Sequence, residues 1–182
     1  ADNPNDIEFV FRFDDDDMKT IETIKDYYKD VDINLNLLTG KRHGFYFLNE
    51  YLDECIQESS GEFVLYWAND YEMCPKNEYC WDAQIKELEG QMYIADFPCV
   101  ENKFSNAHRW PFAVVVPRKF YELVYRGNCP NTIVDKWFIE FFKGNDVWVR
   151  LKSNTLHHQV WSGHVRSDAT YIEGRRAWDT GQ

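Results

Sequence analysis

Stretches rich in strand-forming residues alternate along this chain with stretches of helical spacing. Residues 7–13 are dominated by aromatic and β-branched side chains, which favours a strand. Ile21, Ile24 and Tyr28 then recur at the three- to four-residue spacing of a helix over residues 18–28. A strand followed directly by a helix is the repeating unit of an α/β fold.

The same two patterns predict the remaining elements. The expected strands cover residues 31–38, 63–67, 91–97, 111–116 and 146–151, and the expected helices cover 45–58, 81–88, 118–124 and 131–143. The run 63–67 is continuously apolar, so it predicts a strand that is buried rather than half-exposed. The helix over 131–143 carries an apolar stripe that leaves Asp135, in its first turn, free to face a cleft or simply to favour the helix N-terminus.

Two of the expected strands end in carboxylates. Asp70 follows the run 63–67, and four aspartates, Asp14 to Asp17, follow the first strand. Ligands of open α/β sheets bind beyond the carboxyl ends of the strands, although a polar turn would explain Asp70 equally well. Helix capping explains one or two of the four aspartates but not the whole run, because adjacent like charges repel. The two acidic ends together favour a shared ligand cleft.

Basic and titratable groups are found in two further places. Lys41, Arg42 and His43 lie between two glycines in a loop, where they can pair with a ligand phosphate or form a solvated turn. His157 and His158 lie near the C-terminus; such a pair more often packs or faces solvent than binds a metal.

Composition limits the function classes. The chain has 182 residues, of which 44% are hydrophobic and 17% aromatic, as expected for one globular domain with one core. The net charge of −11 argues against nucleic acid as a partner, whereas a nucleotide can bind if a divalent cation screens its phosphates. No run approaches the roughly 20 apolar residues of a membrane span. The five cysteines show no paired framework, which favours free thiols in a reducing, cytoplasmic compartment.

The order of these pieces resembles the glycosyltransferases of the GT-A fold, in particular the family 2-like enzymes of bacteria, phages and large viruses. The resemblance covers nearly the whole chain and is carried by residues 9–17, 40–45 with 61–73, and 111–137 followed by 157–171. It implies an α/β Rossmann-like sandwich with a central mixed, mostly parallel sheet flanked by helices. It also implies a single domain over 1–182, with a nucleotide-sugar-binding half (1–97) and an acceptor-binding, catalytic half (98–182).

The resemblance also implies an activity. Such an enzyme transfers a sugar from a nucleotide-diphosphate sugar, such as a UDP- or GDP-sugar, to a hydroxyl group of a glycan or other acceptor, here with inversion. The residues that match the nucleotide-binding positions are Asp14, Asp15, Asp16, Lys41, Arg42 and Asn69. A divalent cation, Mn²⁺ or Mg²⁺, is expected on Asp70 with His158 or His157, and Asp135 is expected as the general base.

The chain departs from the family pattern in two ways. The Asp-X-Asp metal motif reads Ala68-Asn69-Asp70, so its first carboxylate is replaced, and the family's first strand and helix would precede Ala1. Both departures favour an alternative, a degenerate domain that binds a nucleotide sugar or a divalent cation without transfer. A plain acidic Ca²⁺-binding or interaction domain is a third reading. An incomplete sheet also leaves an edge that can pair with another chain in an oligomer.

Overall fold

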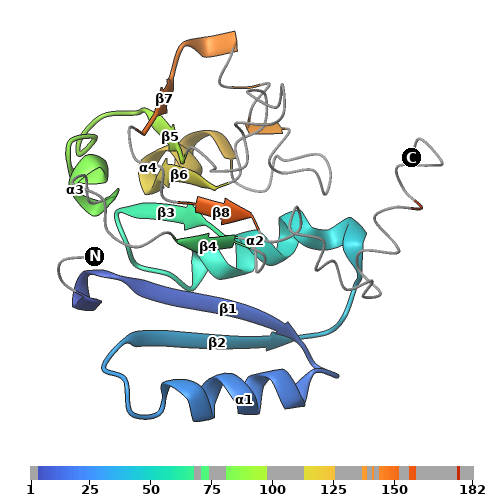
Figure 1. Ribbon diagram of the computed structural model, residues 1–182. Coiled ribbons are helices and arrows are strands. Elements are labelled where there is room, and N and C mark those ends of the chain that lie inside the picture. Colours follow the sequence, from blue (N-terminus) through green and yellow to red (C-terminus); the bar gives the residue numbers. More distant parts are fainter. Residues whose placement is uncertain are drawn as a thin grey trace. The chain divides into compact units, whose positions relative to one another are not determined.

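The described part of the chain forms two compact units that contain both helices and strands (Figure 1). A computed structural model describes residues 4–67, 71–73, 81–97, 113–125, 137–138, 141, 144–151, 156–158 and 176. The first unit comprises residues 1–61, 130–132 and 169–182, and the second comprises 62–129 and 133–168. Both contain parallel strands, and the second also contains antiparallel ones, so the expected α/β class with mixed pairing is confirmed.

The first unit is built on a strand–helix–strand crossover. After a short 3-10 turn, η1 (Pro4–Asp6), strand β1 (Glu8–Asp14) pairs in parallel with β2 (Asn34–Gly40), and α1 (Met18–Tyr28) connects them. Parallel strands cannot be joined by a tight turn, and a helix is the usual connection. The register runs from Glu8 opposite Asn34 to Asp14 opposite Gly40, so both strands end at the same edge.

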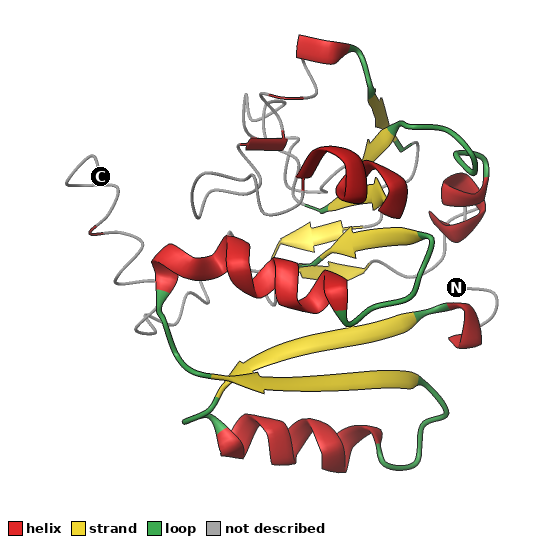
Figure 2. Ribbon diagram, turned by 180° about the vertical axis from the view of Figure 1, so that it is seen from behind, coloured by secondary structure: helices red, strands yellow, loops and turns green. Residues whose placement is uncertain are grey.

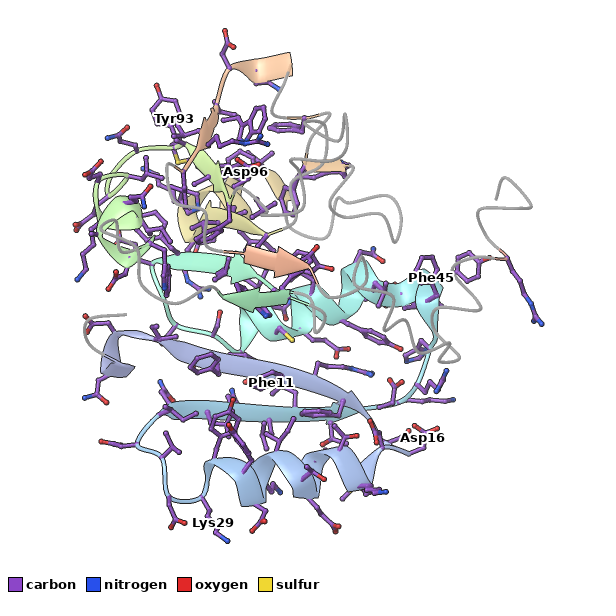
Figure 3. The ribbon with its side chains drawn as sticks, viewed as in Figure 1. Phe11, Asp16, Lys29, Phe45, Tyr93 and Asp96 are labelled. Carbon is purple, nitrogen blue, oxygen red and sulfur yellow. The ribbon has the colours of Figure 1, made fainter. Side chains whose placement is uncertain are left out.

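The two faces of this strand pair carry different side chains. Every second residue of β1 from Phe9 to Phe13 is a phenylalanine, so these three side chains lie on one face of the strand. The ring centroids are 6.4 Å apart between Phe9 and Phe11 and 6.1 Å apart between Phe11 and Phe13 (Phe11 is labelled in Figure 3). Helix α1 lies beside β2 in both ribbon views (Figures 1 and 2) and buries Ile21 to 3% exposure. Between α1 and β2 runs an open groove of about 400 Å³, whose floor includes Leu35.

A second helix covers the opposite face of β1. This helix, α2 (Leu48–Gln57), follows the 3-10 turn η2 (Phe45–Phe47) and lies beside β1. The chain that leaves α2 is tied back to the start of β1, because the Glu8 carboxylate accepts hydrogen bonds from the Ser60 amide (2.7 Å) and hydroxyl (3.0 Å). The first unit is therefore a layer of two strands between two helices.

The second unit contains a four-stranded sheet in the order β3-β6-β5-β7. Its strands are β3 (Phe63–Tyr66), β6 (Val114–Pro117), β5 (Ile94–Asp96) and β7 (Trp148–Arg150). Strand β6 pairs antiparallel with β3 and β5, whereas β5 and β7 are parallel. Its helical pieces include α3 (Trp81–Lys86), α4 (Arg118–Phe120) and the π-helical turn η4 (Tyr121–Tyr125). The short strands β4 (Tyr71–Met73) and β8 (Leu156–His158) form a separate antiparallel pair.

Burial in the second unit centres on β5 and β6 rather than on β3. Ile94 and Ala95 of β5 and Val114 and Val115 of β6 are 0–1% exposed, and Phe97 packs beside them at 1%. The expectation that the run 63–67 is buried is wrong, since all of its residues are half-buried. The physical reason is position: among the described strands, β3 lies at the edge of its sheet, whereas β6 lies between two neighbours.

Most expected elements are found, with displaced ends. The strand expected over 31–38 begins only at Asn34, because the amides of Val31 and Ile33 instead close turns at the end of α1. The helix over 118–124 is α4 followed by η4. Of the helix expected over 131–143, residues 137–138 and 141 are described and are helical.

The strand pairing differs from the expected arrangement in number and direction. Strands β4 and β8 were not expected. Three of the five described pairings are antiparallel, and the described strands form three separate sheets where one mostly parallel sheet was expected.

No helix among the described residues is long and apolar enough to cross a membrane.

Candidate functional site

The acidic end of β1 and the basic loop after β2 meet at one edge of the first unit. Asp14, the last residue of β1, pairs with Gly40, the last residue of β2, and the Asp15 amide donates a hydrogen bond to the Gly40 carbonyl (2.8 Å). The next residue after Gly40 is Lys41. The structure thus brings together five of the six residues expected to bind the nucleotide, namely Asp14, Asp15, Asp16, Lys41 and Arg42.

The aspartates after β1 are only partly explained by helix capping. Asp17 is the N-cap residue of α1, yet its side chain accepts a hydrogen bond from the Thr20 hydroxyl (2.7 Å) rather than from a helix amide. Asp15 and Asp16 are exposed, and Figure 3 shows Asp16 pointing outward where β1 gives way to α1. Their carboxylates therefore face solvent at the edge where a ligand of an α/β unit would bind.

Arg12 lies behind this edge and was not singled out by the sequence. Its guanidinium forms an ion pair with Asp14 through Nη1 and one with Glu54 through Nε (3.1 Å), and its Nη2 donates to the Lys41 carbonyl (2.5 Å). The side chain is only 4% exposed. Burial alone would lower the pKa of Arg12, but the hydrogen bonds with Glu54 and Asp14 raise it above its ordinary value, so the group stays charged.

Helix α2 holds the basic loop through a tyrosine. The Tyr51 ring lies under the Arg12 guanidinium, with Cζ 3.7 Å from the ring centroid, a cation–π distance. The Tyr51 hydroxyl accepts hydrogen bonds from the backbone amides of His43 (2.6 Å) and Gly44 (3.1 Å). Lys41 stays exposed and Arg42 half-buried. The loop backbone is thus fixed while the Lys41 side chain reaches solvent.

Gly40 is needed because Arg12 passes close to it. A Cβ atom on Gly40 would lie 2.9 Å from Nη2 of Arg12, closer than real Cβ contacts occur. The glycine lets the guanidinium reach the Lys41 carbonyl beyond it. A cation within the apolar run 9–13, two positions before an aspartate, is the signal that could have identified Arg12 from the sequence.

The expected metal ligands fall in the second unit and are described only in part. Asn69, Asp70 and Asp135 lie outside the described residues. Strand β4 begins at the residue after Asp70, and its register sets Tyr71 opposite His158 and Glu72 opposite His157. The backbone next to Asp70 in sequence therefore runs beside both histidines. Among the residues the structure describes, no group of three or more His, Cys, Asp or Glu side chains could hold a metal ion.

A buried ion pair in the second unit was also missed. Asp96, at the end of β5, is 1% exposed and accepts hydrogen bonds from Arg150 Nη2 (2.9 Å) and Trp148 Nε1 (3.0 Å), both from β7 (Asp96 is labelled in Figure 3). Burial raises the pKa of Asp96, although the Arg150 hydrogen bond and charge oppose the rise. The partners of Asp96 come from a strand more than fifty residues away, so no local sequence pattern predicts the ion pair.

Comparison with known proteins adds no family assignment. No protein-family model matches the chain. No curated protein sequence matches it either. The resemblance to GT-A glycosyltransferases therefore rests on the residues quoted for it, and the structure contributes the α/β class and the geometry of the two sites described above.

Proposed function

We propose that this chain is a nucleotide-sugar glycosyltransferase domain of the GT-A type. The observation that supports the proposal best is the shared edge of β1 and β2, where Asp14, Asp15 and Asp16 meet Lys41 and Arg42. Nucleotides of α/β proteins bind at the carboxyl ends of parallel strands, where strand ends and helix starts leave polar groups exposed. An edge that offers both carboxylates and cations suits a ligand with hydroxyl and phosphate groups.

The groups at this edge match the parts of a nucleotide diphosphate. Carboxylates accept hydrogen bonds from ribose hydroxyls and from base N–H groups, the role proposed for Asp14, Asp15 and Asp16. Lys41 and Arg42 are proposed to donate to phosphate oxygens, where charge-assisted hydrogen bonds are strongest. The resemblance adds Asn69, which lies outside the described residues, as a further proposed contact for a ribose or diphosphate oxygen.

A divalent cation fits the donor set proposed for the diphosphate. Asp70 supplies a hard carboxylate oxygen, and His158 or His157 an imidazole, a combination that suits Mn²⁺ and to a lesser extent Mg²⁺. The β4–β8 register supports this set, because the chain that follows Asp70 runs beside the histidines. When bound, such an ion neutralises charge that develops on the leaving diphosphate.

Asp135 is the proposed general base. The acceptor hydroxyl must lose its proton as its oxygen attacks the anomeric carbon, and one carboxylate can take that proton while the diphosphate leaves from the opposite face. A single displacement of this kind inverts the configuration of the sugar. Replacement of Asp135 by Asn should therefore abolish transfer while leaving donor binding intact.

One observation favours a second function. The metal motif retains a single carboxylate, Asp70, because residue 68 is alanine. A cation bound this way has fewer charged ligands, so the domain can bind a nucleotide sugar or a bare cation and transfer nothing. The two functions share the donor site and differ only in turnover.

Thermal unfolding with ligand panels tests the proposal. UDP, GDP and their sugar conjugates are each added with and without Mn²⁺, since a ligand that binds only the folded chain raises the midpoint by mass action. The proposal expects a shift that needs both one nucleotide and the metal and that Asp14→Asn reduces. The matched control is Asp26→Asn, which removes an exposed carboxylate of α1 paired with Lys29 (2.8 Å).

Three other outcomes separate the readings. A metal-dependent nucleotide shift without release of free sugar or transfer to any acceptor favours the binding domain. A shift with Mn²⁺ or Ca²⁺ alone favours a cation-binding domain. No shift with any ligand refutes the donor site.

A further inference from the structure

We infer that Arg12 positions the proposed nucleotide-binding edge, where β1 and β2 end. It holds the end of β1 and the backbone of the loop 41–44 in the arrangement that a nucleotide diphosphate requires. The inference rests on the proposed function for its ligand and on the described contacts for its geometry. Arg12 acts through Asp14 and Lys41, and is not assigned a contact with the ligand.

The guanidinium joins three separate pieces of the first unit. Its Nη1 pairs with Asp14 at the end of β1, its Nη2 donates to the Lys41 carbonyl in the loop, and its Nε pairs with Glu54 on α2. A planar fork can serve three partners in fixed directions, whereas an ammonium cannot reproduce that geometry. The three pieces are therefore held at set distances from one another.

Arg12 binds one carboxylate oxygen of Asp14 and the backbone carbonyl of Lys41, so the other carboxylate oxygen and the Lys41 side chain are left for a ligand. It contacts Oδ1 of Asp14, and within the described part of the chain Oδ2 has no hydrogen-bond partner. It takes the carbonyl of Lys41, while the Lys41 side chain stays exposed. This division is what a group that orients a site would produce, since the oriented atoms remain available.

The charge of Arg12 also makes an acidic edge compatible with a diphosphate. Asp14 alone would repel phosphate oxygens, but a buried cation beside it offsets its charge. A buried ion pair is in general weak evidence for a stabilising role, because desolvation cancels much of the attraction. Orientation of the edge accounts for the arrangement better than stability does.

Tyr51 extends the effect of Arg12 to the next two residues of the loop. Its ring lies against the guanidinium and its hydroxyl accepts the amides of His43 and Gly44. If Arg12 is shortened, the ring loses the group that it packs against, and the two amides lose a fixed acceptor. Exchange of these two amides with solvent therefore reports on Arg12 without any ligand.

The test compares Arg12→Lys with Arg150→Lys, measured by backbone hydrogen exchange and by titration with UDP and GDP in the presence of Mn²⁺. Arg150→Lys is the matched control, because it makes the same change in a carboxylate-bound arginine of the other unit. We expect Arg12→Lys to speed exchange of His43 and Gly44 by about tenfold or more and to raise the nucleotide Kd similarly, as loss of a charge-assisted hydrogen bond implies. Arg150→Lys should leave both within about twofold.

Each outcome decides the inference. Unchanged exchange of His43 and Gly44 in Arg12→Lys overturns it, and so does an equal acceleration throughout β1 and α1, since that indicates a merely structural role. If Arg12→Lys does not fold, Glu54→Gln replaces it, because it removes the charge that pairs with Arg12 Nε and leaves the Tyr51 hydroxyl in place. Faster exchange of the same amides with a higher nucleotide Kd then supports the inference, and no change overturns it. Wild-type chain that binds neither nucleotide refutes the proposed function, whereas the exchange result still decides whether Arg12 positions the loop.

Discussion

Replacement of Gly40 by alanine tests how rigidly the Arg12 network is held. The new Cβ would lie 2.9 Å from Nη2 and 3.5 Å from Cζ of Arg12, so the guanidinium has to move by a few tenths of an ångström. The far end of an arginine usually gives way at little cost. Here it is fixed by Asp14, Glu54 and the Lys41 carbonyl, so movement weakens at least one of these contacts.

The magnitude follows from two opposing effects. Loss of a hydrogen bond made by a charged donor costs about 1.5–3 kcal/mol. Alanine in place of glycine reduces the conformational entropy of the unfolded chain, which stabilises the folded state by about 0.4–1 kcal/mol. Gly40→Ala should therefore lower the free energy of unfolding by about 0.5–2.6 kcal/mol, the difference between these effects. Urea unfolding followed by circular dichroism measures it.

Two other glycines serve as controls for this substitution. Within the described part of the chain, no atom beyond the chain neighbours and the local helix backbone would lie within 4 Å of a Cβ on Gly144, so Gly144→Ala should stabilise the chain by about 0.4–1 kcal/mol. Gly90 has φ +74°, and no described atom beyond its chain neighbours would lie within 4 Å of its Cβ, so Gly90→Ala should destabilise the chain by about 1–2 kcal/mol through backbone strain. If Gly40→Ala proves as stabilising as Gly144→Ala, Arg12 yields freely and the reasoning about a rigid network is refuted.

Three further predictions concern single buried groups. Burial and the nearby Glu54 charge raise the pKa of the Cys55 thiol to about 11. At pH 8, iodoacetamide should therefore alkylate Cys55 about 100-fold more slowly in the native chain than in the urea-unfolded chain. Equal alkylation rates by mass spectrometry would contradict this. Burial raises the pKa of Asp96, so the native chain binds this proton more tightly than the unfolded chain does. The free energy of unfolding should then fall as pH rises above the ordinary aspartate pKa of about 3.9. Asp96→Asn, compared with wild type between pH 4 and 7, should remove that fall. An identical pH profile for the two chains would refute the prediction. Phe97 is 1% exposed, so Phe97→Ala should cost about 3–5 kcal/mol in urea unfolding, and a cost below about 1 kcal/mol would mean that the site is not closely packed.

The local pattern predicted the elements whose signal lies within their own residues. Helix α1 spans the expected 18–28, and β1 ends at Asp14, one residue beyond the expected strand. Two parallel strands joined by one helix end at the same edge, so sequence order could also have predicted that the acidic run meets the basic loop, although the prediction paired that run with Asp70. Periodicity and turn residues are local properties, and these features depend on little else.

Features that depend on distant partners could not be predicted. An apolar run has the same pattern at the edge and at the centre of a sheet, so the run 63–67 predicts a buried strand, whereas β6, about fifty residues later, lies between two neighbours. Strands β4 and β8 have three residues each, too few for a period. Arg12 gains its role from Glu54, which lies 42 residues further along the chain. Nothing in the neighbourhood of either residue shows that they meet.

The β4–β8 pair has a consequence for the order in which the chain folds. Tyr71 and His158 are 87 residues apart, whereas the β1–β2 partners Glu8 and Asn34 are 26 apart. Closing the longer loop costs about 1 kcal/mol more in chain entropy, and pairings of large sequence separation form slowly. At a synthesis rate of about 5–20 residues per second, β8 is made roughly 6–25 s after β2 begins. On the ribosome, the strands that carry the proposed nucleotide-binding residues can thus be paired well before the histidines proposed as metal ligands exist.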